Sequence, residues 1–251
     1  MTERYDHRVL VPVAILEGET VPETIIDAIA SLPVVILGYH EVPAQTAPGQ
    51  ARMTFEQQAR AELDELQDVF EGAGCDVMTR NVFTLDRFKT FERAAVELHC
   101  DAILILNPVP VLESVLVAIR GDANVDYIAR FVAAFLAGTT IHVTLFHVVT
   151  DDEDRDQGIG NLETAAARLV EHDVERNNIE IVVVDDERPT HAIVTAAADH
   201  DLLVMGESRP SIRRHIFRDR AERIARRTID PVLVIRGEYL ESPPPETEAD
   251  R

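Results

Sequence analysis

The sequence predicts an α/β protein built from two tandem, doubly wound parallel-sheet domains, and three observations support this prediction. Short apolar runs alternate with helical patterns along most of the 251 residues. Two stretches of the chain repeat the same order of strands and helices. Hydrophobic residues make up 46% of the composition, which is ordinary for a globular protein with a buried core. Alternating strands and helices of these lengths are typical of parallel sheets with helices on both faces.

Four apolar runs in the first stretch are expected to be strands: His7–Ala14, Val34–His40, Cys75–Val82 and Asp101–Pro108. The first strand is followed by apolar residues spaced three and four apart, namely Val21, Ile25, Ala28, Ile29 and Leu32. This spacing predicts a helix with one apolar stripe against the sheet. A long polar helix is expected over Thr54–Gly72.

The second stretch repeats this order, with strands expected at Glu113–Arg120, His142–His147, Ile179–Asp185 and Asp201–Gly206. Its helices are expected from Val125 to Leu136 and over Asn161–Asn177. It then continues through a helix, Asp219–Thr228, into a last strand, Pro231–Arg236. The first stretch has no counterpart of this last helix and strand, so the first domain is expected to be truncated. We therefore predict domains at 1–111 and 112–237.

Residues 238–251 are acidic and rich in proline, and this composition predicts a disordered tail. The strand before the tail, Val232–Ile235, is apolar and terminal. An exposed strand of this kind carries unpaired backbone donors and acceptors that favour self-association. A homodimer formed through this C-terminal strand is therefore expected.

The formal net charge is -21, and Lys89 is the only lysine. Such a surface repels polyphosphate backbones, which argues against nucleic-acid binding. An acid excess with almost no lysine fits a cytoplasm rich in salt, and we therefore hypothesise a halophilic source. No apolar run is long enough to cross a bilayer, and the start of the sequence lacks a signal-peptide core. A cytoplasmic protein without direct membrane insertion is expected.

The sequence contains none of the common catalytic or metal-binding motifs. Cys75 and Cys100 are too few for a disulfide framework and lack metal-ligand spacing, so both are expected to be buried thiols. The histidines form no metal pattern, and His40 and His147 are interpreted as structural residues at equivalent strand ends. No nucleophile elbow or Walker loop is present. No catalytic residue is assigned, and nothing in the residues indicates an enzyme.

The second stretch resembles the universal stress protein family. The most specific part is Asp201–Gly206, followed by Ala221–Ala225 and by Pro231–Ile235; His147-Val148-Val149 and Arg188-Pro189 also fit. The resemblance covers Leu112–Gly237 well and Tyr5–Pro110 weakly. It implies a five-stranded, doubly wound, Rossmann-like domain that is often dimeric through its final strand. It also implies that ATP or a related adenine nucleotide is bound in some family members.

Family members that bind ATP carry Gly-x2-Gly-x9-Gly-Ser/Thr after the fourth strand, because glycines allow backbone N–H groups to approach phosphates closely. In this chain only the first glycine is present, as Gly206; Arg209 and the Arg218–Arg220 stretch replace the other two. The family's nucleotide binders also place an Asp at the end of the first strand. Arg120 stands at that position in the second stretch, and Ala14 in the first.

Eight arginines lie between positions 209 and 227, which makes a basic segment in an acidic chain. Arginine can chelate phosphate oxygens with two parallel hydrogen bonds, so these side chains could replace the glycine loop. Alternatively they line the outer face of the last helix and pair with surface acids, or they form a protein-binding patch. The candidate cofactor-binding residues are Gly206, Ser208, Arg209, Ser211, Arg213, Arg218, Arg220 and Arg120.

Two functions are consistent with these residues. The first is a non-enzymatic stress-response or regulatory module that has lost or altered nucleotide binding. The second is an adenine-nucleotide binder, for ATP or AMP, that uses arginines in place of glycines. Similar domains occur beside membrane transporters, so the family resemblance suggests a transporter or another regulatory protein as a partner. An enzyme of the wider nucleotide-binding α/β group is a third possibility.

The charge of the chain makes its stability depend on salt. Lowering the ionic strength from 1 M to 0.01 M lengthens the screening distance from about 3 Å to about 30 Å, so repulsion among the carboxylates should grow. We expect the helical circular dichroism signal to be complete in molar KCl and to decrease at low salt. A signal that stays constant over the whole series would contradict the halophilic hypothesis.

Overall fold

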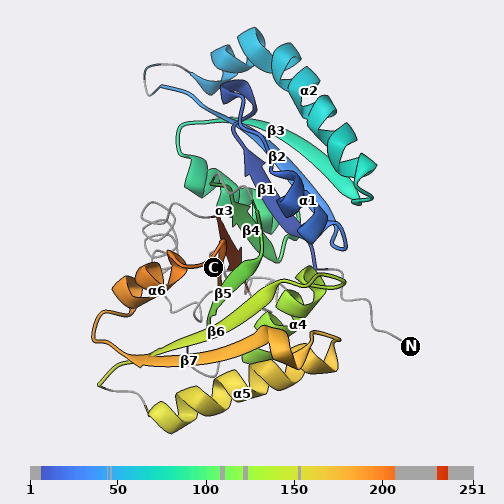
Figure 1. The fold of residues 1–251 in the computed structure, drawn as a ribbon. Helices are drawn as coiled ribbons and strands as arrows, with labels where there is room; N and C mark the ends of the chain where they lie inside the picture. Colours follow the sequence, from blue (N-terminus) through green and yellow to red (C-terminus); the bar gives the residue numbers. More distant parts are fainter. Residues whose placement is uncertain are drawn as a thin grey trace, which may run out of the picture.

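The computed structural model describes residues 7–43, 45, 47–107, 111–120, 124–151, 154–206 and 231–236. These residues form one sheet of nine strands with helices on both faces (Figure 1). The strand order is β3-β2-β1-β4-β9-β8-β5-β6-β7. All neighbouring strands are parallel except β4 and β9, which are antiparallel. The predicted α/β class with two doubly wound sheets is confirmed, and the two sheets are continuous.

The first half of the chain supplies four strands at one end of the sheet. Its elements are β1 (Val9–Val13), η1 (Ile15–Glu17), α1 (Glu23–Ile29), β2 (Val34–Glu41), α2 (Pro48–Gly72), β3 (Val77–Thr84), α3 (Arg87–Glu97) and β4 (Ala102–Ile105). The central strands β1 and β2 are buried along most of their length because helices cover both of their faces.

The second half supplies five strands at the other end. Its elements are β5 (Ser114–Ala118), α4 (Val125–Phe135), β6 (His142–Val149), α5 (Arg155–Glu171), η2 (Arg176–Asn178), β7 (Ile179–Asp185), α6 (Pro189–Ala197), β8 (Leu202–Gly206) and β9 (Val232–Ile235). The predicted helix Asp219–Thr228 and the tail 238–251 lie outside the described residues.

Two helices begin earlier than their apolar patterns indicated, and both are started by local signals. α2 begins at Pro48 rather than Thr54, with proline in its first turn, where its missing N–H costs no hydrogen bond. α5 begins at Arg155 and ends at Glu171, whereas Asn161–Asn177 was predicted. The Asp154 side chain caps α5 by accepting the Asp156 N–H at 2.9 Å.

The helices divide between the two faces of the sheet. α1, α2, α4 and α5 lie on one face, and α3 and α6 lie on the other (Figure 1). The apolar residues under the first group form a single core cluster that includes Ile29 of α1 and Phe131 of α4. The two halves therefore share one core on this face. On the other face, α3 and α6 each cover a separate cluster.

The C-terminal strand β9 is not free at its edge. β9 pairs in parallel with β8 on one side and antiparallel with β4 on the other, with Ala102 opposite Ile235 and Ile105 opposite Val232. The prediction that this strand offers its edge to a second copy is therefore wrong. The truncated first half leaves β4 without a neighbour of its own, and β9 takes that place within the same chain.

In each half, an aspartate carboxylate accepts a backbone N–H at the start of the first strand. Asp101 accepts the Arg8 N–H at 2.9 Å, just before β4 and β1. Asp201 accepts the Ser114 N–H at 2.9 Å, just before β8 and β5. Each carboxylate therefore fixes the start of the first strand of its half to the start of the fourth.

Asp101 also connects the two halves. Its second carboxylate oxygen accepts the Tyr127 hydroxyl of α4 at 2.8 Å, and its carbonyl accepts the Arg236 N–H at 2.7 Å. His7 lies beside it, with ring centroids 5.3 Å from Tyr127 and 5.1 Å from Phe131. Burial lowers the pKa of His7, and this effect exceeds the opposing attraction of Asp101.

Both cysteines are buried free thiols, as predicted. Burial raises the pKa of Cys100 to about 12, so this thiol is not a nucleophile at neutral pH. Among the helices in the described ranges, none combines the length and the apolar character needed to cross a membrane.

Replacing Asp101 with Ala should destabilise the protein by about 1.5–3 kcal/mol, because the Arg8 N–H and the Tyr127 hydroxyl both lose a charged acceptor. Urea unfolding measures this difference. Tyr127→Phe is the matched variant, since it removes only one of the two bonds and should cost less. Equal stability of Asp101→Ala and the unaltered protein would show that this contact does not hold the halves together.

Candidate nucleotide crevices

In a doubly wound sheet, ligands bind beyond the carboxyl ends of the strands, where the chain leaves adjacent strands toward opposite faces. In the second half this position lies between β5 and β8, which are paired with Ala118 opposite Met205. In the first half it lies between β1 and β4. These two positions are the candidate nucleotide crevices.

Two of the sequence-predicted site residues lie at the edge of the sheet that carries the second-half crevice. Gly206 is the last residue of β8, and Arg120 lies two residues beyond the end of β5. Because β5 and β8 are neighbours, both residues lie at the same edge of the sheet, and Arg120 is exposed there. The other candidates lie outside the described residues: Ser208, Arg209, Ser211, Arg213, Arg218 and Arg220.

Gly206 is required by packing at this edge. A Cβ atom at this position would overlap the Cδ1 atom of Ile128 in α4 and lie 3.2 Å from its Cγ1. Ile128 is only 3% exposed, so its side chain has little room to move. The glycine that the sequence pattern assigned to phosphate binding therefore also has a purely structural reason to be glycine.

The end of β5 is fixed by the neighbouring strand. The Ile119 N–H donates to the Phe146 carbonyl at 2.9 Å, and His147 Nδ1 donates to the Ile119 carbonyl at 2.8 Å. His147 is buried against α5, where a Cβ on Gly158 would come within 2.5 Å of the imidazole ring. These contacts give His147 the structural role that the sequence predicted, and they hold the strand end that carries Arg120.

The strand registers correct one detail of the predicted repeat. Val34 pairs with Val9, and Val143 pairs with Val115, so Gly38 is the counterpart of His147. His40 corresponds to Val149 and not to His147, because the second strand of each half had been aligned two residues out of step. The same registers confirm that Ala14 and Arg120 are equivalent.

At the first-half crevice, the end of β1 is bound by its own chain. After β1, the short helix η1 leads to Gly18, whose φ of 72° is in the left-handed region that favours glycine. The turn brings the Glu19 carboxylate back to the end of β1, where it accepts the Ala14 N–H. Burial raises the pKa of Glu19.

Two further residues close this edge. Tyr39, near the end of β2, packs edge to face on Phe91 of α3, with centroids 4.9 Å apart. Burial raises the pKa of Tyr39, and the Arg87 guanidinium partly opposes that rise. Sequence reasoning missed Glu19, Tyr39 and Arg87. The only available signal was the Gly18-Glu19 pair directly after a strand, which indicates a turn but not its contacts.

No group of histidine, cysteine and carboxylate side chains suited to a metal ion is found within the described part of the chain. The two acidic residues at the end of β7 make a backbone hydrogen bond and an ion pair. Asp186 accepts the Arg188 N–H at 2.7 Å, and Asp185 pairs with Arg155 at 2.5 Å. These contacts account for the two carboxylates without a ligand.

The sheet order, with two switch points at strand ends, defines a protein of the Rossmann-like α/β class. Residues 112–236 match the model of the universal stress protein family. This part of the chain therefore belongs to the universal stress protein family, as its resemblance predicted. A search of curated proteins found no match.

Several solved structures share the fold over nearly the whole chain. A universal stress protein from Archaeoglobus fulgidus DSM 4304 is 15% identical, with a TM-score of 0.61, and the match covers 93% of this chain and 98% of that chain. The cytoplasmic domain of a prokaryotic cation chloride cotransporter is 12% identical, with a TM-score of 0.54 and coverage of 95% and 98%. A putative universal stress protein from Pseudomonas aeruginosa UCBPP-PA14 is 14% identical, with a TM-score of 0.51 and coverage of 94% and 95%.

Replacing Gly206 with Ala should lower the free energy of unfolding by about 1–3 kcal/mol, because the added methyl group overpacks the contact with Ile128. Chemical denaturation without any nucleotide measures the change. Gly160→Ala is the control, since a Cβ there meets nothing within 4 Å and α5 should gain up to about 1 kcal/mol. If Gly206→Ala were as stable as the unaltered protein, packing against Ile128 would not explain this glycine. Close approach of a phosphate to the backbone would then be the remaining explanation.

Proposed function

We propose that the protein is a non-enzymatic regulatory module of the universal stress protein type, acting in the cytoplasmic stress response, with lost or altered nucleotide binding. The proposal divides the chain into a truncated domain at 1–111, a complete domain at 112–237 and a tail at 238–251. The observation that carries it is the contact at the end of β1 in the first crevice, where the Glu19 carboxylate accepts the Ala14 N–H.

The closure of the first crevice removes the donor that a ligand would use. A nucleotide at a strand end is held mainly by backbone N–H groups. The Ala14 N–H already donates to the Glu19 carboxylate, and a negative charge at this position would repel a phosphate. Tyr39 and Phe91 fill the adjoining space with aromatic rings. A ligand would have to displace this half-buried carboxylate.

The second crevice supports altered binding more than complete loss. Gly206 packs against Ile128, and Arg120 stands where the family's nucleotide binders place an Asp. An arginine at this position would not accept hydrogen bonds from an adenosine group as a carboxylate does. The same positive charge would nevertheless attract a phosphate.

The alternative function is adenine-nucleotide binding in the second half, with ATP or AMP as the ligand. The observation that favours it is that Gly206 and the exposed Arg120 share one edge of the sheet. The arginine segment from Arg209 to Arg227 follows Gly206 directly in the sequence. Under this alternative, guanidinium groups would bind phosphates in place of the glycine loop.

A regulatory role requires a partner, and we propose a membrane transporter or another regulatory protein. A cotransporter's cytoplasmic domain shares the fold at a TM-score of 0.54 over 95% of this chain. The proposed module would act by protein contact rather than by chemistry.

We expect freshly purified protein, denatured and analysed by chromatography, to release no adenine nucleotide at near-equal stoichiometry. Thermal shifts in high salt with ATP, AMP and cyclic nucleotides should likewise show no stabilisation by millimolar ligand, where a 1 mM dissociation constant corresponds to about -4 kcal/mol of binding. Nucleotide that is retained through purification would contradict the proposal that this module has lost nucleotide binding.

Variants separate the two candidate functions. If a nucleotide stabilises the protein, replacing both Arg209 and Arg213 with Glu should abolish that shift under the arginine-based alternative. Glu92→Gln, at a partly exposed position of α3 in the other half of the chain, is a control that should leave the shift unchanged. A shift that persists in the double variant would exclude these two arginines as phosphate ligands.

A further inference from the structure

The strand β3 forms one end of the sheet and pairs only with β2. The Val34 N–H donates to the Asp76 carbonyl, and the Val42 N–H donates to the Thr84 carbonyl. In a parallel pair, alternate residues direct their backbone groups to the same neighbour. The outward groups of β3 therefore belong to Val77, Thr79, Asn81 and Phe83. No side-chain donor or acceptor from the described residues contacts them.

The opposite end of the sheet is protected. There the Asp186 N–H donates to the Val149 carbonyl, so the odd-numbered residues of β7 direct their backbone groups outward. Arg176 donates to the outward Ile179 carbonyl at 2.8 Å, and Arg155 to the outward Val183 carbonyl at 3.2 Å. Side chains that cover an edge in this way hinder the addition of another strand. Within the described part of the chain, no side chain covers the outward backbone groups of β3 in the first half in this way.

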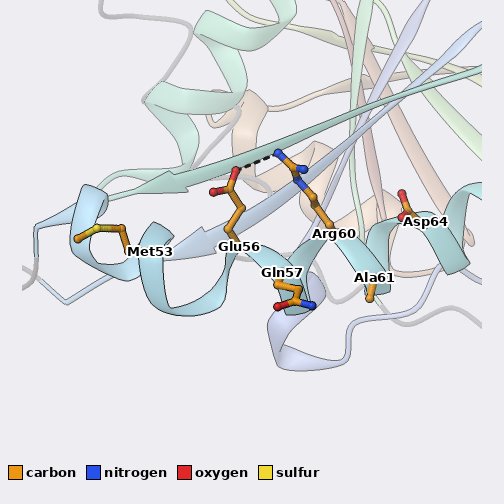
Figure 2. A pocket seen from close by; sticks show the side chains of 6 residues that line it. All are labelled: Met53, Glu56, Gln57, Arg60, Ala61 and Asp64. Atoms are coloured by element: carbon orange, nitrogen blue, oxygen red, sulfur yellow. Dashed lines mark hydrogen bonds and ion pairs between the residues drawn. The ribbon is translucent and has the colours of Figure 1, made fainter.

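One flank of α2 overhangs the open edge of β3. Thr79 donates its hydroxyl to the Gln67 side chain of α2, which identifies the flank. At about 100° per residue, the side chains of Glu56, Arg60 and Asp64 lie on the same flank as Gln67. Figure 2 shows Glu56, Arg60 and Asp64 extending from α2 toward the side on which β3 runs. They line a surface hollow with Met53, Gln57 and Ala61.

The charge of this flank selects the kind of strand that can dock. Arg60 and Arg52 pair with the same Glu56 carboxylate, at 3.2 and 3.7 Å, so the excess negative charge of this flank lies further along α2, at Asp64 and Glu71. A second copy of the chain would bring the same carboxylates face to face, and these like charges would repel. A strand with basic side chains on one face would instead complement them. Met53, 82% exposed, offers an apolar contact at the end of the hollow.

We propose that the open edge of β3 is a docking site for an extended segment of a partner protein, which adds to the sheet as a tenth strand and directs basic side chains at the acidic flank of α2. Backbone hydrogen bonds to Val77, Thr79, Asn81 and Phe83 supply affinity, and the alternating charges supply specificity. This inference concerns a different part of the molecule from the nucleotide crevices, so it does not depend on the proposed function.

The test uses the full chain and a fluorescein-labelled peptide about as long as β3, in which arginine alternates with threonine or valine. Fluorescence anisotropy should show saturable binding. A peptide with the same residues but N-methylated at alternate positions should bind at least about tenfold more weakly, because it keeps the charge and loses the backbone donors. A peptide with glutamate in place of arginine should not bind.

Variants of the protein locate the site. Thr79→Pro removes an outward N–H of β3 while leaving the bonds to β2 in place, and should weaken binding at least about tenfold. Ile181→Pro makes the matched change on β7 and should leave affinity unchanged. Replacing Glu56 and Asp64 with Gln and Asn should weaken binding, whereas Glu62→Gln with Glu65→Gln, on the other flank of α2, should have a much smaller effect.

Some outcomes would overturn the proposal. Equal affinity for the plain and N-methylated peptides would show general attraction to an acidic protein, and so would an unchanged affinity in Thr79→Pro. Absence of saturable binding would also overturn it. Because the N-methylated peptide is tested on the unaltered chain, the proposal stays testable even if Thr79→Pro does not fold.

Discussion

The antiparallel pairing of β4 with β9 is the contact on which the rest of the molecule depends. Four residues of each strand take part, and all are buried or nearly buried. The pairing joins two parallel sheets into one and allows α1 and α4 to share a core. It also reverses the strand direction between the halves. The carboxyl ends of the two halves therefore lie at opposite edges of the sheet, and the two crevices face away from each other.

The two halves share the same contacts at the amino ends of their strands and differ in packing further along the strands. Asp101 and Asp201 make the same contact at the start of each half. At the carboxyl ends the packing differs: Gly38 in the first half corresponds to His147 in the second. A Cβ on Gly38 would meet Ile15 and Leu63, whereas His147 is accommodated because Gly158 faces it on α5. The two halves thus differ in how the helix after the second strand packs on that strand.

The fold was readable from the sequence because its signals are local and repeated. Buried parallel strands such as Leu202–Met205 are continuous apolar runs, and the α1 and α4 stripes have the helical period. Helix starts were missed by six residues where Pro48 and Asp154 begin the helix within polar sequence. The pairing of β9 was also missed, since an apolar strand has the same pattern whether its neighbour is in the same chain or another.

The candidate site was predictable only in part. Gly206 and Arg120 lie at the same edge of the sheet, because β5 and β8 are adjacent parallel strands, but their role in binding stays a prediction. The contact between Glu19 and Ala14 could not be predicted from spacing, since it depends on the direction in which a turn returns a side chain. The packing reason for Gly206 depends on Ile128, which is 78 positions earlier in the chain.

The shared sheet has a consequence for synthesis on the ribosome. The first half emerges complete in its own elements, yet the neighbour of β4 is β9, which is made only after β5, β6, β7 and β8. Until then the β4 edge has no partner, and long-range strand pairing of this kind closes slowly. The nascent first half must therefore wait, with an apolar strand uncovered, until the ribosome has made the other strands of the second half.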